Sequence, residues 1–579
     1  MRHILVFFAL LGVVQAAETK PNIIVIYTDD HGFADLGIHG VEKDVKTPHL
    51  DALARSGVIA KHGYSSAPQC VPSRGGLMTG KFQGRFNLDS NNSSLEGFNK
   101  ETTIATRLQR SGYVTAQFGK WHLGPTREIP DHGFTHTYSQ HGQQKFSANI
   151  TLEGKDKPMG DLPPEMYHVD GCAKAAASII DRYKEQPFFL YIAFRAPHTP
   201  LDAPQSYKNR FPGAMPERRR AALGMLAAVD DGVGLITSTL KKNSLTKKTL
   251  IFVIGDNGAP LKILKTDSPL NGDAGGWDGS LNTPLNGEKG MLAEGGMHVP
   301  FLIAWPGTIP GGQTYEQPVS ALDVAATAAA LADISVKPGD LDGVNLVPYL
   351  KGEIATPPHE ALMWRWMAQS AIREGNWKLL RGGEREYLYD LATDLEEKHN
   401  LASQHPEIAA RLRTKLTAWC AELNPPGLAL GPMAPVWNDY FDYYLEGKPA
   451  PKPELDTGIR GWMARGGSLS DKDGVLVLTP DKEGKGTFIT HSRLKLAGPV
   501  TATMTFKAAV AGQGAISWRV DGDKDFLPAN RISFEVKASD GWQTHNVQIP
   551  AKGRVIHVRL QLPPGPAQFR TLDFKPASR

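Results

Sequence analysis

The sequence predicts an α/β protein with a mostly parallel central sheet, a small α+β subdomain and an additional C-terminal β-sandwich. Three observations predict it. Continuous apolar runs alternate with helical patterns up to about residue 358. Short strands and one amphipathic helix follow as far as residue 424, and many short alternating strands fill the chain beyond residue 455. The length of 579 residues suits this division, and 41% hydrophobic with 21% charged residues is ordinary for globular domains.

The N-terminus has the pattern of a signal peptide, over residues 1–17. A basic start precedes an apolar run at 4–14, and small residues follow at Ala16 and Ala17. The run is shorter than the roughly 20 apolar residues that a membrane-spanning helix needs. We therefore expect a periplasmic or secreted protein that leaves the membrane when the signal is removed. The alternative, a buried N-terminal strand, is disfavoured because a polar stretch follows at once.

The first α/β domain is expected over residues 18–358. Apolar runs without alternation are typical of strands covered on both faces of a sheet. Five runs have this character: 22–27, 113–118, 188–194, 250–254 and 299–305. Helical patterns with start signals lie between them, over 49–56, 104–111 and 218–240. This alternation is the signature of a mostly parallel sheet.

A change of pattern marks the smaller C-terminal parts. In residues 359–424, strand patterns at 362–366, 370–373, 377–381 and 387–390 precede a helical pattern at 406–423. A Pro-rich linker over 425–454 leads to the predicted β-sandwich of residues 455–579. The tryptophans of that sandwich are expected in its core, with carbohydrate binding as the alternative: Trp462, Trp518 and Trp542.

Charge and cysteine content exclude two classes of protein. The formal net charge is +4, from 64 basic and 60 acidic residues without a long run of one sign, so nucleic acid is not an indicated partner. The short arginine cluster at 218–220 is expected on an exposed helix face. Three cysteines are too few for a disulfide scaffold in a chain of this size. Cys172 and Cys420 either pair or remain buried free thiols, and the sequence leaves this open.

Polar side chains follow four of the five apolar runs. In open α/β sheets, ligands bind beyond the carboxyl ends of the strands, so neighbouring strands would gather these groups at one rim. A single such pair is usually a cap or a solvated loop, whereas four convergent pairs favour a functional site. The groups are Asp29-Asp30, Lys120 with His122, Arg195 with His198, and Asp256-Asn257.

Two kinds of chemistry are represented among these groups. Asp29, Asp30, Asp256 and Asn257 offer only oxygen atoms, which selects Ca²⁺, with Mg²⁺ as the alternative, over zinc. The structural alternative is helix capping by Asp30 and a turn at Asp256-Asn257. Ammonium and imidazole groups form the second kind, and they suit the binding of an anionic group and its proton transfers. This second kind comprises Lys120, His122, His198 and Lys289.

Residues 70–80 read Cys-Val-Pro-Ser-Arg-Gly-Gly-Leu-Met-Thr-Gly. This segment resembles the signature of formylglycine-dependent (type I) sulfatases, Cys-x-Pro-Ser-Arg, two variable residues, then Leu-x-Thr-Gly, at every fixed position. Other landmarks resemble the family in the same order: Asp29-Asp30, Gly119 to Gly124, Pro197 to Pro200, Asp256-Asn257-Gly258, and Gly287 to Gly290 followed by Glu294-Gly295-Gly296. The resemblance covers about residues 21–424 and excludes the β-sandwich. Within the family, the chain resembles bacterial exported glycan sulfatases. It implies an alkaline-phosphatase-like catalytic domain with the family's C-terminal subdomain.

The resemblance also implies a mechanism. Cys70 would be oxidised to formylglycine by a maturation enzyme, and one hydroxyl of the hydrated aldehyde would attack sulfur. The second hydroxyl would then lose its proton, expelling sulfate and restoring the aldehyde. The four oxygen-bearing residues and modified Cys70 would bind one Ca²⁺. The other implied roles are Arg74 holding the formylglycine, Lys120 and Lys289 holding sulfate oxygens, His198 protonating the leaving alcohol, and His122 deprotonating the hydrate.

A sulfated glycan, attacked one sugar at a time, is the substrate that export and the long loops at the rim suggest. Loop solvation and core packing are the alternative roles for the residues considered as sugar contacts. These candidates are His31, His132, His136, His141, Arg195, Trp364 and Arg365. One departure from the family is His298, at a position that is often arginine.

Two other functions stay open at this point. One is a formylglycine-dependent phosphodiesterase or phosphonate monoester hydrolase of the same superfamily. The other is a non-catalytic glycan-binding protein that keeps the fold. The sequence also leaves open the sugar, the position of its sulfate, the role of the β-sandwich and the oligomeric state.

Overall fold

The structure is a computed structural model. It describes residues 20–140, 146–162, 166–261, 277–428, 433–449, 459–481, 486–492, 494–523 and 525–577. The signal peptide predicted at 1–17 and the candidate His141 lie outside the described residues. The chain divides into two compact units, Met1–Pro451 and Lys452–Arg579.

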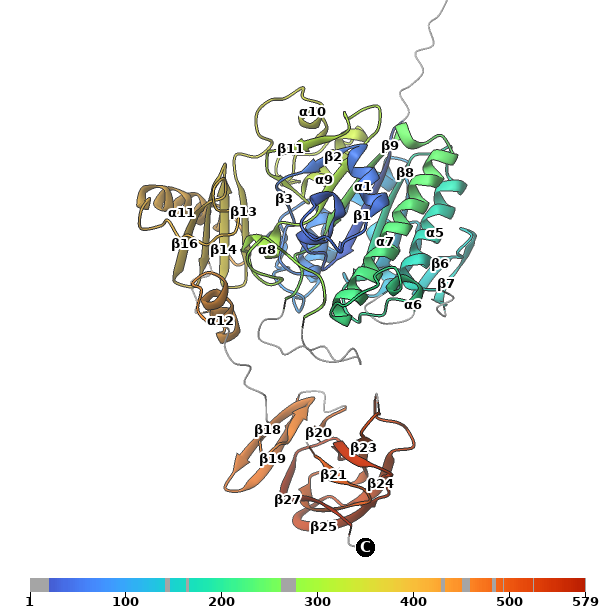
Figure 1. The fold of residues 1–579 in the computed structure, drawn as a ribbon, viewed down its shortest axis with the longest axis vertical. Coiled ribbons are helices and arrows are strands. Elements are labelled where there is room, and N and C mark those ends of the chain that lie inside the picture. Colours follow the sequence, from blue (N-terminus) through green and yellow to red (C-terminus); the bar gives the residue numbers. More distant parts are fainter. Residues whose placement is uncertain are drawn as a thin grey trace, which may run out of the picture. The chain divides into compact units, whose positions relative to one another are not determined.

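A ten-stranded sheet forms the centre of the first unit (Figure 1). Its middle strands run parallel in the order β9 (Thr249–Gly255), β1 (Asn22–Asp29), β8 (Phe188–Pro197), β4 (Val114–Lys120) and β5 (His136–Gln140). The apolar runs that predicted the first four strands are buried on both faces, which confirms the mostly parallel sheet. The fifth predicted run forms β10 (Phe301–Ala304), which pairs antiparallel with β9. The edges are β2 (Val58–Ala60) and β11 (Gln313–Tyr315) on one side, and β6 (Phe146–Ile150) and β7 (Asp156–Leu162) on the other.

Helices cover both faces of this sheet. One face packs against α1 (Pro48–Arg55), α5 (His168–Arg182) and α7 (Glu217–Lys242), and the other against α2 (Cys70–Thr79), α4 (Ile104–Arg110) and α9 (Asp323–Leu331). Of the described helices, only α7 has the length and composition of a membrane span, but 72% of its apolar window is buried, as in a core helix (Figure 1). Short elements complete the unit: β3 (Gly63–Tyr64), β12 (Val319–Ser320), α3 (Glu96–Asn99), α6 (Gln205–Lys208), α8 (Glu294–Met297) and α10 (Val347–Leu350).

The arginine cluster of α7 is not the exposed face that the sequence predicts. Arg219 is buried, and its guanidinium lies 2.7 Å from both Asp35 and Asp44. Arg218 is buried as well and donates to the carbonyl of Trp277. The charges are accommodated because the loop after β1 supplies carboxylates, a distant contact that local sequence does not reveal.

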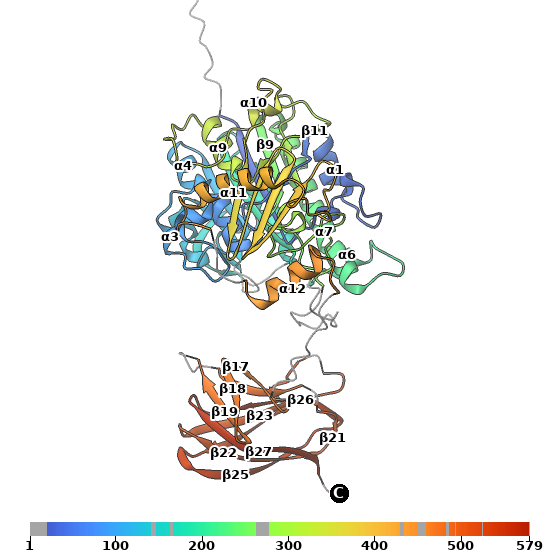
Figure 2. The same ribbon diagram turned by 90° about the vertical axis from the view of Figure 1, so that its left-hand side faces the viewer.

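The predicted α+β subdomain is an antiparallel sheet of β13 (Leu362–Trp366), β14 (Gln369–Glu374), β15 (Trp377–Gly382) and β16 (Arg385–Asp390). Figure 2 shows α11 (Pro406–Cys420) lying across this sheet. The core between them also includes Met291, Leu292 and Met297 from the α/β part. The subdomain therefore packs directly on the segment that follows Lys289.

The predicted linker over 425–454 is wrong in one respect, because it contains the helix α12 (Pro435–Tyr444). Pro435 stands in the first turn, where its missing N–H costs no helical hydrogen bond. Phe441 is fully buried beside Tyr387, and a Cβ built on Gly290 would come within 2.3 Å of the Trp437 ring. Aromatic side chains of α12 thus stabilise the helix by packing against distant residues. The Pro-rich composition of the segment alone predicts a linker.

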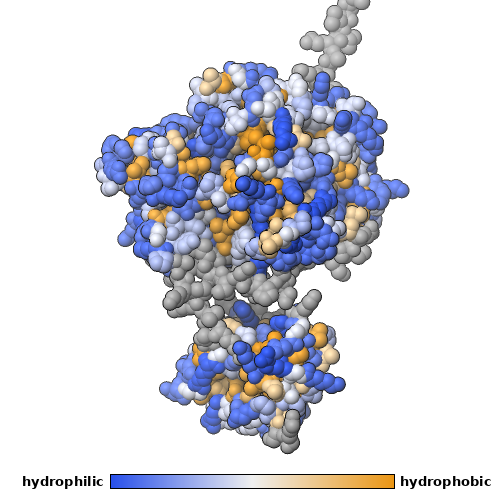
Figure 3. Space-filling view, viewed as in Figure 1, coloured by the Kyte–Doolittle hydropathy of each residue, from blue (hydrophilic) through white to orange (hydrophobic). Residues whose placement is uncertain are grey.

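The second unit is a sandwich of two antiparallel sheets around one core. One sheet contains β17 (Met463–Arg465), β20 (Phe488–His491), β26 (Arg554–Gln561), β23 (Gly512–Val520) and β24 (Arg531–Val536), with β21 (Leu496–Ala497) beside β26. The other contains β18 (Gly467–Lys472), β19 (Val475–Pro480), β27 (Ala567–Pro576), β22 (Val500–Ala508) and β25 (Ser539–Ile549). Hydrophilic residues predominate on the face of each unit that Figure 3 shows. Cys172 and Cys420 are buried free thiols, so they do not pair.

Candidate active site

The carboxyl ends of four neighbouring parallel strands meet at one edge of the central sheet. Asp29 ends β1 and Lys120 ends β4, whereas Asp256 follows β9 and His198 follows β8. Because the strands lie in the order β9-β1-β8-β4, these side chains come together as the sequence predicts. A shift in the pairing of β1 with β8, between Thr28 and Asp29, marks the point where both strands reach the site.

Helix α2 brings the predicted nucleophile to the same edge. Cys70 is its first residue and is 1% exposed, and Arg74 lies one turn later on the same side of the helix. The guanidinium of Arg74 lies 2.8 Å from Asp256 and 3.5 Å from Asp29, and donates to the carbonyl of Lys120 at 3.1 Å. Arg74 therefore ties the helix to the ends of three strands.

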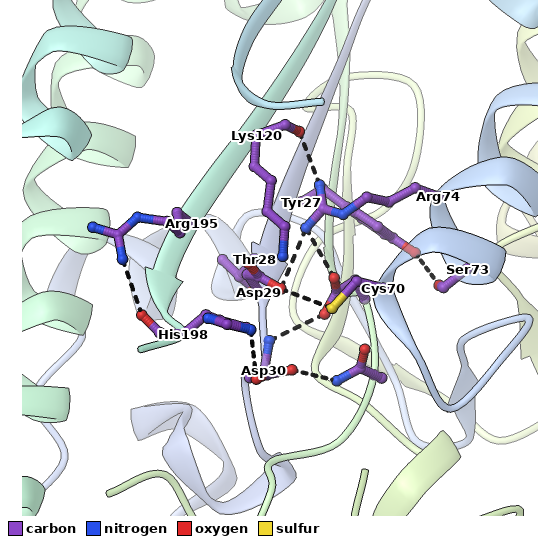
Figure 4. Close-up of polar contacts among 12 residues, drawn as sticks. Tyr27, Thr28, Asp29, Asp30, Cys70, Ser73, Arg74, Lys120, Arg195 and His198 are labelled. Carbon is purple, nitrogen blue, oxygen red and sulfur yellow. Dashed lines mark hydrogen bonds and ion pairs between the residues drawn. The ribbon is translucent and has the colours of Figure 1, made fainter. Parts of the chain in front are cut away.

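Charged groups surround the Cys70 sulfur (Figure 4). Its Sγ lies 3.3 Å from Asp29 Oδ1 and 3.3 Å from Lys289 Nζ. Lys289 Nζ also lies 2.6 Å from Asp30 Oδ1, and Lys120 Nζ lies 2.6 Å from Asp29 Oδ2. His198 Nε2 approaches Asp30 at 3.5 Å from the other side. The site thus combines carboxylates, two ammonium groups and an imidazole around one sulfur atom.

Burial dominates the proton affinities here. It raises the pKa of the Cys70 thiol well above its usual range, so an unmodified Cys70 is a neutral thiol near pH 7. Burial and the neighbouring Asp29 raise the pKa of Asp256 to about 7. For Asp29, burial works in the same direction, but Lys120 and His198 outweigh it and hold the pKa well below its usual range. Burial lowers the pKa of His198 to about 4.

The donor set fits a hard divalent cation. Ligand atoms of Asp29, Asp30, Cys70 and His198 all lie within 4.8 Å of one another. Asn257 donates its amide to Asp30 at 2.6 Å, while its buried Oδ1 has no hydrogen-bond partner among the described residues. An orphaned buried oxygen beside carboxylates is the arrangement that Ca²⁺ or Mg²⁺ would satisfy.

The segment that carries Lys289 is held by the four-stranded subdomain. Gln369 on β14 donates to the carbonyl of Gly290 at 2.9 Å and accepts from the N–H of Leu292 at 3.0 Å. Lys378 on β15 lies 2.7 Å from Glu294, and both side chains are buried. Sequence reasoning missed these residues because each belongs to an ordinary-looking strand or loop, and only their distant contacts link them to Lys289.

A cavity of about 640 Å³ opens at the first turn of α2. It is lined by Val71, the residue after Cys70, by His122 after β4, and by Arg127 in the following loop. Asp161 and Ser147, on β7 and β6, also line it and hydrogen-bond to each other at 3.1 Å. Together with Asn91, which also lines the cavity, they offer polar groups suited to a hydroxyl-rich ligand. These lining residues could not be predicted, because they come from strands and loops without a motif.

Three of the predicted sugar contacts have structural roles. His31 is fully buried, 3.0 Å from Thr28 Oγ1 and 2.9 Å from the carbonyl of Asp35. His132 is buried against Trp121. His136 is buried with its Nε2 2.8 Å from Tyr183 Oη. Buried and engaged in this way, these rings do not face a ligand.

The predicted contacts Trp364 and Arg365 are also corrected by the structure. Trp364 is buried and donates to the carbonyl of Ser65. Arg365 is buried too, and donates to the carbonyls of Asn424 and Gly427, which fastens the end of the subdomain. The alternating pattern of β13 does not reveal that these two side chains hydrogen-bond to backbone carbonyls of distant segments.

Arg195 lies near the site, but its two terminal nitrogens are engaged by the protein. It is 4% exposed, and its guanidinium lies 2.5 Å from Asp202 and 3.5 Å from the carbonyl of His198. Figure 4 shows it reaching from β8 toward His198 rather than toward Cys70. Arg195 therefore supports the loop that carries His198.

The fold and this edge of the sheet define a class: an alkaline-phosphatase-like hydrolase whose site gathers carboxylates, cations and a buried cysteine at the ends of parallel strands. Residues 21–334 match the Sulfatase family, and residues 287–422 match the family described as N-sulphoglucosamine sulphohydrolase, C-terminal. The chain therefore belongs to the sulfatase family and is a sulfuric ester hydrolase.

Individual relatives agree with this assignment. The chain is 28% identical to the uncharacterized sulfatase YdeN of Escherichia coli (strain K12), over 71% of this chain and 87% of that one. It is 30% identical to arylsulfatase A of Bos taurus, over 68% and 86%. Among solved structures, that of Ps i-CgsB in complex with k-i-k-neocarrahexaose is 30% identical with a TM-score of 0.62, covering 73% of this chain and 97% of that one.

Proposed function

We propose that this protein removes sulfate from a sulfated glycan, one sugar at a time, with Cys70 converted to formylglycine. The observation that carries the proposal is the position of Cys70. It begins α2 inside the eleven-residue motif, and its Sγ lies 3.3 Å from both a carboxylate and an ammonium group. A neutral buried thiol is a weak nucleophile, whereas a hydrated aldehyde supplies the two hydroxyls that attack and release of sulfate require.

The donor set favours one Ca²⁺, with Mg²⁺ as the alternative. Asp29, Asp30, Asp256 and Asn257, with modified Cys70, would hold it through oxygen atoms. The ion would supply a fixed positive charge that polarises the reacting oxygen and offsets the negative charge of sulfate. Arg74, fully buried between Asp29 and Asp256, would orient the formylglycine side chain.

The remaining polar groups have the chemistry for anion binding and proton transfer. Lys120 and Lys289 place ammonium groups on either side of Asp29 and Asp30, within reach of sulfate oxygens at the nucleophile. His198, 3.5 Å from Asp30, is placed to give a proton to the leaving alcohol once a bound anionic sulfate ester raises its pKa from about 4. His122, which lines the neighbouring cavity, is assigned the removal of the hydrate proton.

The sugar is proposed to occupy the 640 Å³ cavity beside Val71 and His122. A cavity of this size holds one or two sugar rings rather than a long chain, which favours attack at a chain end. A relative of 30% identity was solved with k-i-k-neocarrahexaose, which supports an oligosaccharide as ligand class. Export, predicted from residues 1–17, would bring the enzyme to such polymers outside the cytoplasm, and a maturation enzyme would first modify Cys70.

Two measurements test the proposal. Mass spectrometry of the tryptic peptide that contains Cys70, after co-expression with a maturation enzyme, should show formylglycine. The modified protein should then release sulfate from one member of a panel of position-defined sulfated monosaccharides, lose this activity with a chelator and regain it with Ca²⁺. Cys70→Ala is the matched inactive control.

Full turnover with unmodified Cys70, or indifference to chelators, would contradict the mechanism. Assays of an aryl sulfate and an aryl phosphodiester side by side distinguish a sulfatase from a phosphodiesterase. Faster turnover of the phosphodiester would favour the phosphodiesterase.

A further inference from the structure

The outer face of one β-sandwich sheet carries an aromatic ring with two cations over it. On β22, Val500, Ala502, Met504 and Phe506 alternate into the core and are buried. The intervening side chains therefore point outward, and Lys507 is the last of these before the strand ends. Lys507 Nζ lies 4.9 Å from the centre of the Trp542 ring on the neighbouring β25, and Arg570 Cζ of β27 lies 4.0 Å from it.

Trp542 differs from the other tryptophans of this unit. Trp462 and Trp518 are each 4% exposed and belong to the sandwich core, as the sequence predicts. Trp542 is only partly buried and is not a member of that core. The prediction of a core position is therefore wrong for this tryptophan, whose ring lies on the outer face.

A break in strand pairing places Arg570 at this ring. Along β22, Thr505 pairs with Thr571 and Phe506 pairs with Phe569, so Arg570 is the extra residue of a bulge. Bulges commonly redirect a side chain. Here the bulge adds a second cation to the outer face at the position of Trp542.

These two cations lack carboxylate partners. Among the residues that the structure describes, neither Lys507 nor Arg570 forms an ion pair, whereas Lys575 on the same sheet lies 2.7 Å from Asp573. The indole holds the two charges in place without neutralising them. Such a pair is suited to an anionic group such as a sulfate ester.

We propose that the Trp542 face, defined as Trp542, Lys507 and Arg570, binds a sulfated polysaccharide chain independently of the catalytic site. The choice of a sulfated glycan as ligand rests on the proposed function. The adjoining face is polar, because threonines of β22 hydrogen-bond across to Gln548, Asn546 and Thr544 of β25. The exposed large hydrophobic side chains described in this unit, Val510 and Leu527, lie outside these strands, so a protein partner is disfavoured.

The test uses the full chain with Cys70→Ala, so that binding is measured without turnover. Affinity electrophoresis in dextran sulfate should retard this protein, and unsulfated dextran should not. Adding Lys507→Gln and Arg570→Gln should weaken binding by about tenfold or more, since both would contact sulfate groups. Trp542→Ala should weaken it as well. Lys575→Gln, the matched control with a paired cation, should change it by less than about twofold.

Thermal unfolding of each variant shows whether the sandwich remains folded. The proposal is overturned if the folded double variant binds dextran sulfate as tightly as its parent, or if Lys575→Gln weakens binding equally. Sulfate release from a small sulfated monosaccharide, assayed with Cys70 intact, separates the two proposals. The double variant should keep that activity. If no variant releases sulfate, the proposed function is refuted, and the dextran sulfate binding data still test the Trp542 face.

Discussion

Lys378 of the four-stranded sheet lies 2.7 Å from Glu294, in the segment that carries Lys289. Its ammonium group also lies 2.8 Å from Glu397, and all three side chains are at most 1% exposed. Glu294 accepts in addition from Tyr64 Oη at 2.8 Å and lies 3.0 Å from His298 Nδ1. The subdomain is thus joined to the active-site segment by buried charges, and His298 belongs to this network at the position where the family often has arginine.

Replacing Lys378 with methionine should leave two buried carboxylates without their cation. Loss of one partner of a buried ion pair costs about 3–5 kcal/mol. We expect a loss of this size in the free energy of unfolding, measured by denaturant titration. Lys351→Met is the control, because its partner Glu353 is half exposed and the pair contributes about 1 kcal/mol or less. Equal effects of the two substitutions would refute the role of the buried network.

Gln369→Leu should impair catalysis through Lys289. The substitution leaves the Gly290 carbonyl and the Leu292 N–H without their partner, at a cost of about 1–3 kcal/mol each. Because Lys289 is adjacent, kcat should fall more than KM rises, in steady-state assays of the folded variant. Gln369→Glu restores the acceptor for Leu292 and should recover part of the rate. Unchanged kcat in Gln369→Leu would show that the hydrogen bonds of Gln369 to Gly290 and Leu292 do not position Lys289.

The raised pKa of Glu397 makes the stability of the folded protein depend on pH. Burial, with Glu294 nearby, raises its pKa from the ordinary 4.5 to about 7 in the folded chain. The folded state therefore binds more protons than the unfolded state between these values, so this contribution to stability is present below pH 4.5 and is lost as pH rises through 7. Melting temperatures from pH 5 to 8 should fall more steeply for the parent than for Glu397→Gln. Parallel curves would contradict the raised pKa.

Arg127 is expected to contribute to substrate binding without contributing to stability. Its side chain is 79% exposed at the rim of the cavity. Arg127→Ala should raise KM for a sulfated sugar several-fold, by about 1 kcal/mol of lost binding, with the melting temperature unchanged. Lys100→Ala, whose side chain is 72% exposed and does not line this cavity, should leave KM unchanged. The same KM for both variants would place the sugar elsewhere.

Arg365 should show the opposite pattern. Its guanidinium is buried and bound to backbone carbonyls at the end of the subdomain. Arg365→Ala should lower the free energy of unfolding by about 2–4 kcal/mol and leave KM of the folded protein unchanged. A raised KM without lost stability would restore Arg365 as a substrate contact.

Much of the site could be predicted because its signals are local. The continuous apolar run before Asp29 and the one before Asp256 predict buried parallel strands, and strand topology then brings their polar ends to one edge. The motif that begins at Cys70 occupies eleven consecutive positions, so it needs no knowledge of distant contacts. Of the three tryptophans expected in the sandwich core, Trp462 and Trp518 lie there and Trp542 does not.

What the sequence determined by itself was therefore the class of fold, the family motif and the kind of chemistry at the strand ends. Only the tertiary structure decided the environment of each long polar or aromatic side chain. Arg219 and Arg365 are buried because acids or carbonyls from distant segments meet them, and Trp542 remains on the surface beside two cations. The physical reason is that burial of a charge depends on partners brought together by folding, and these partners lie far away along the chain.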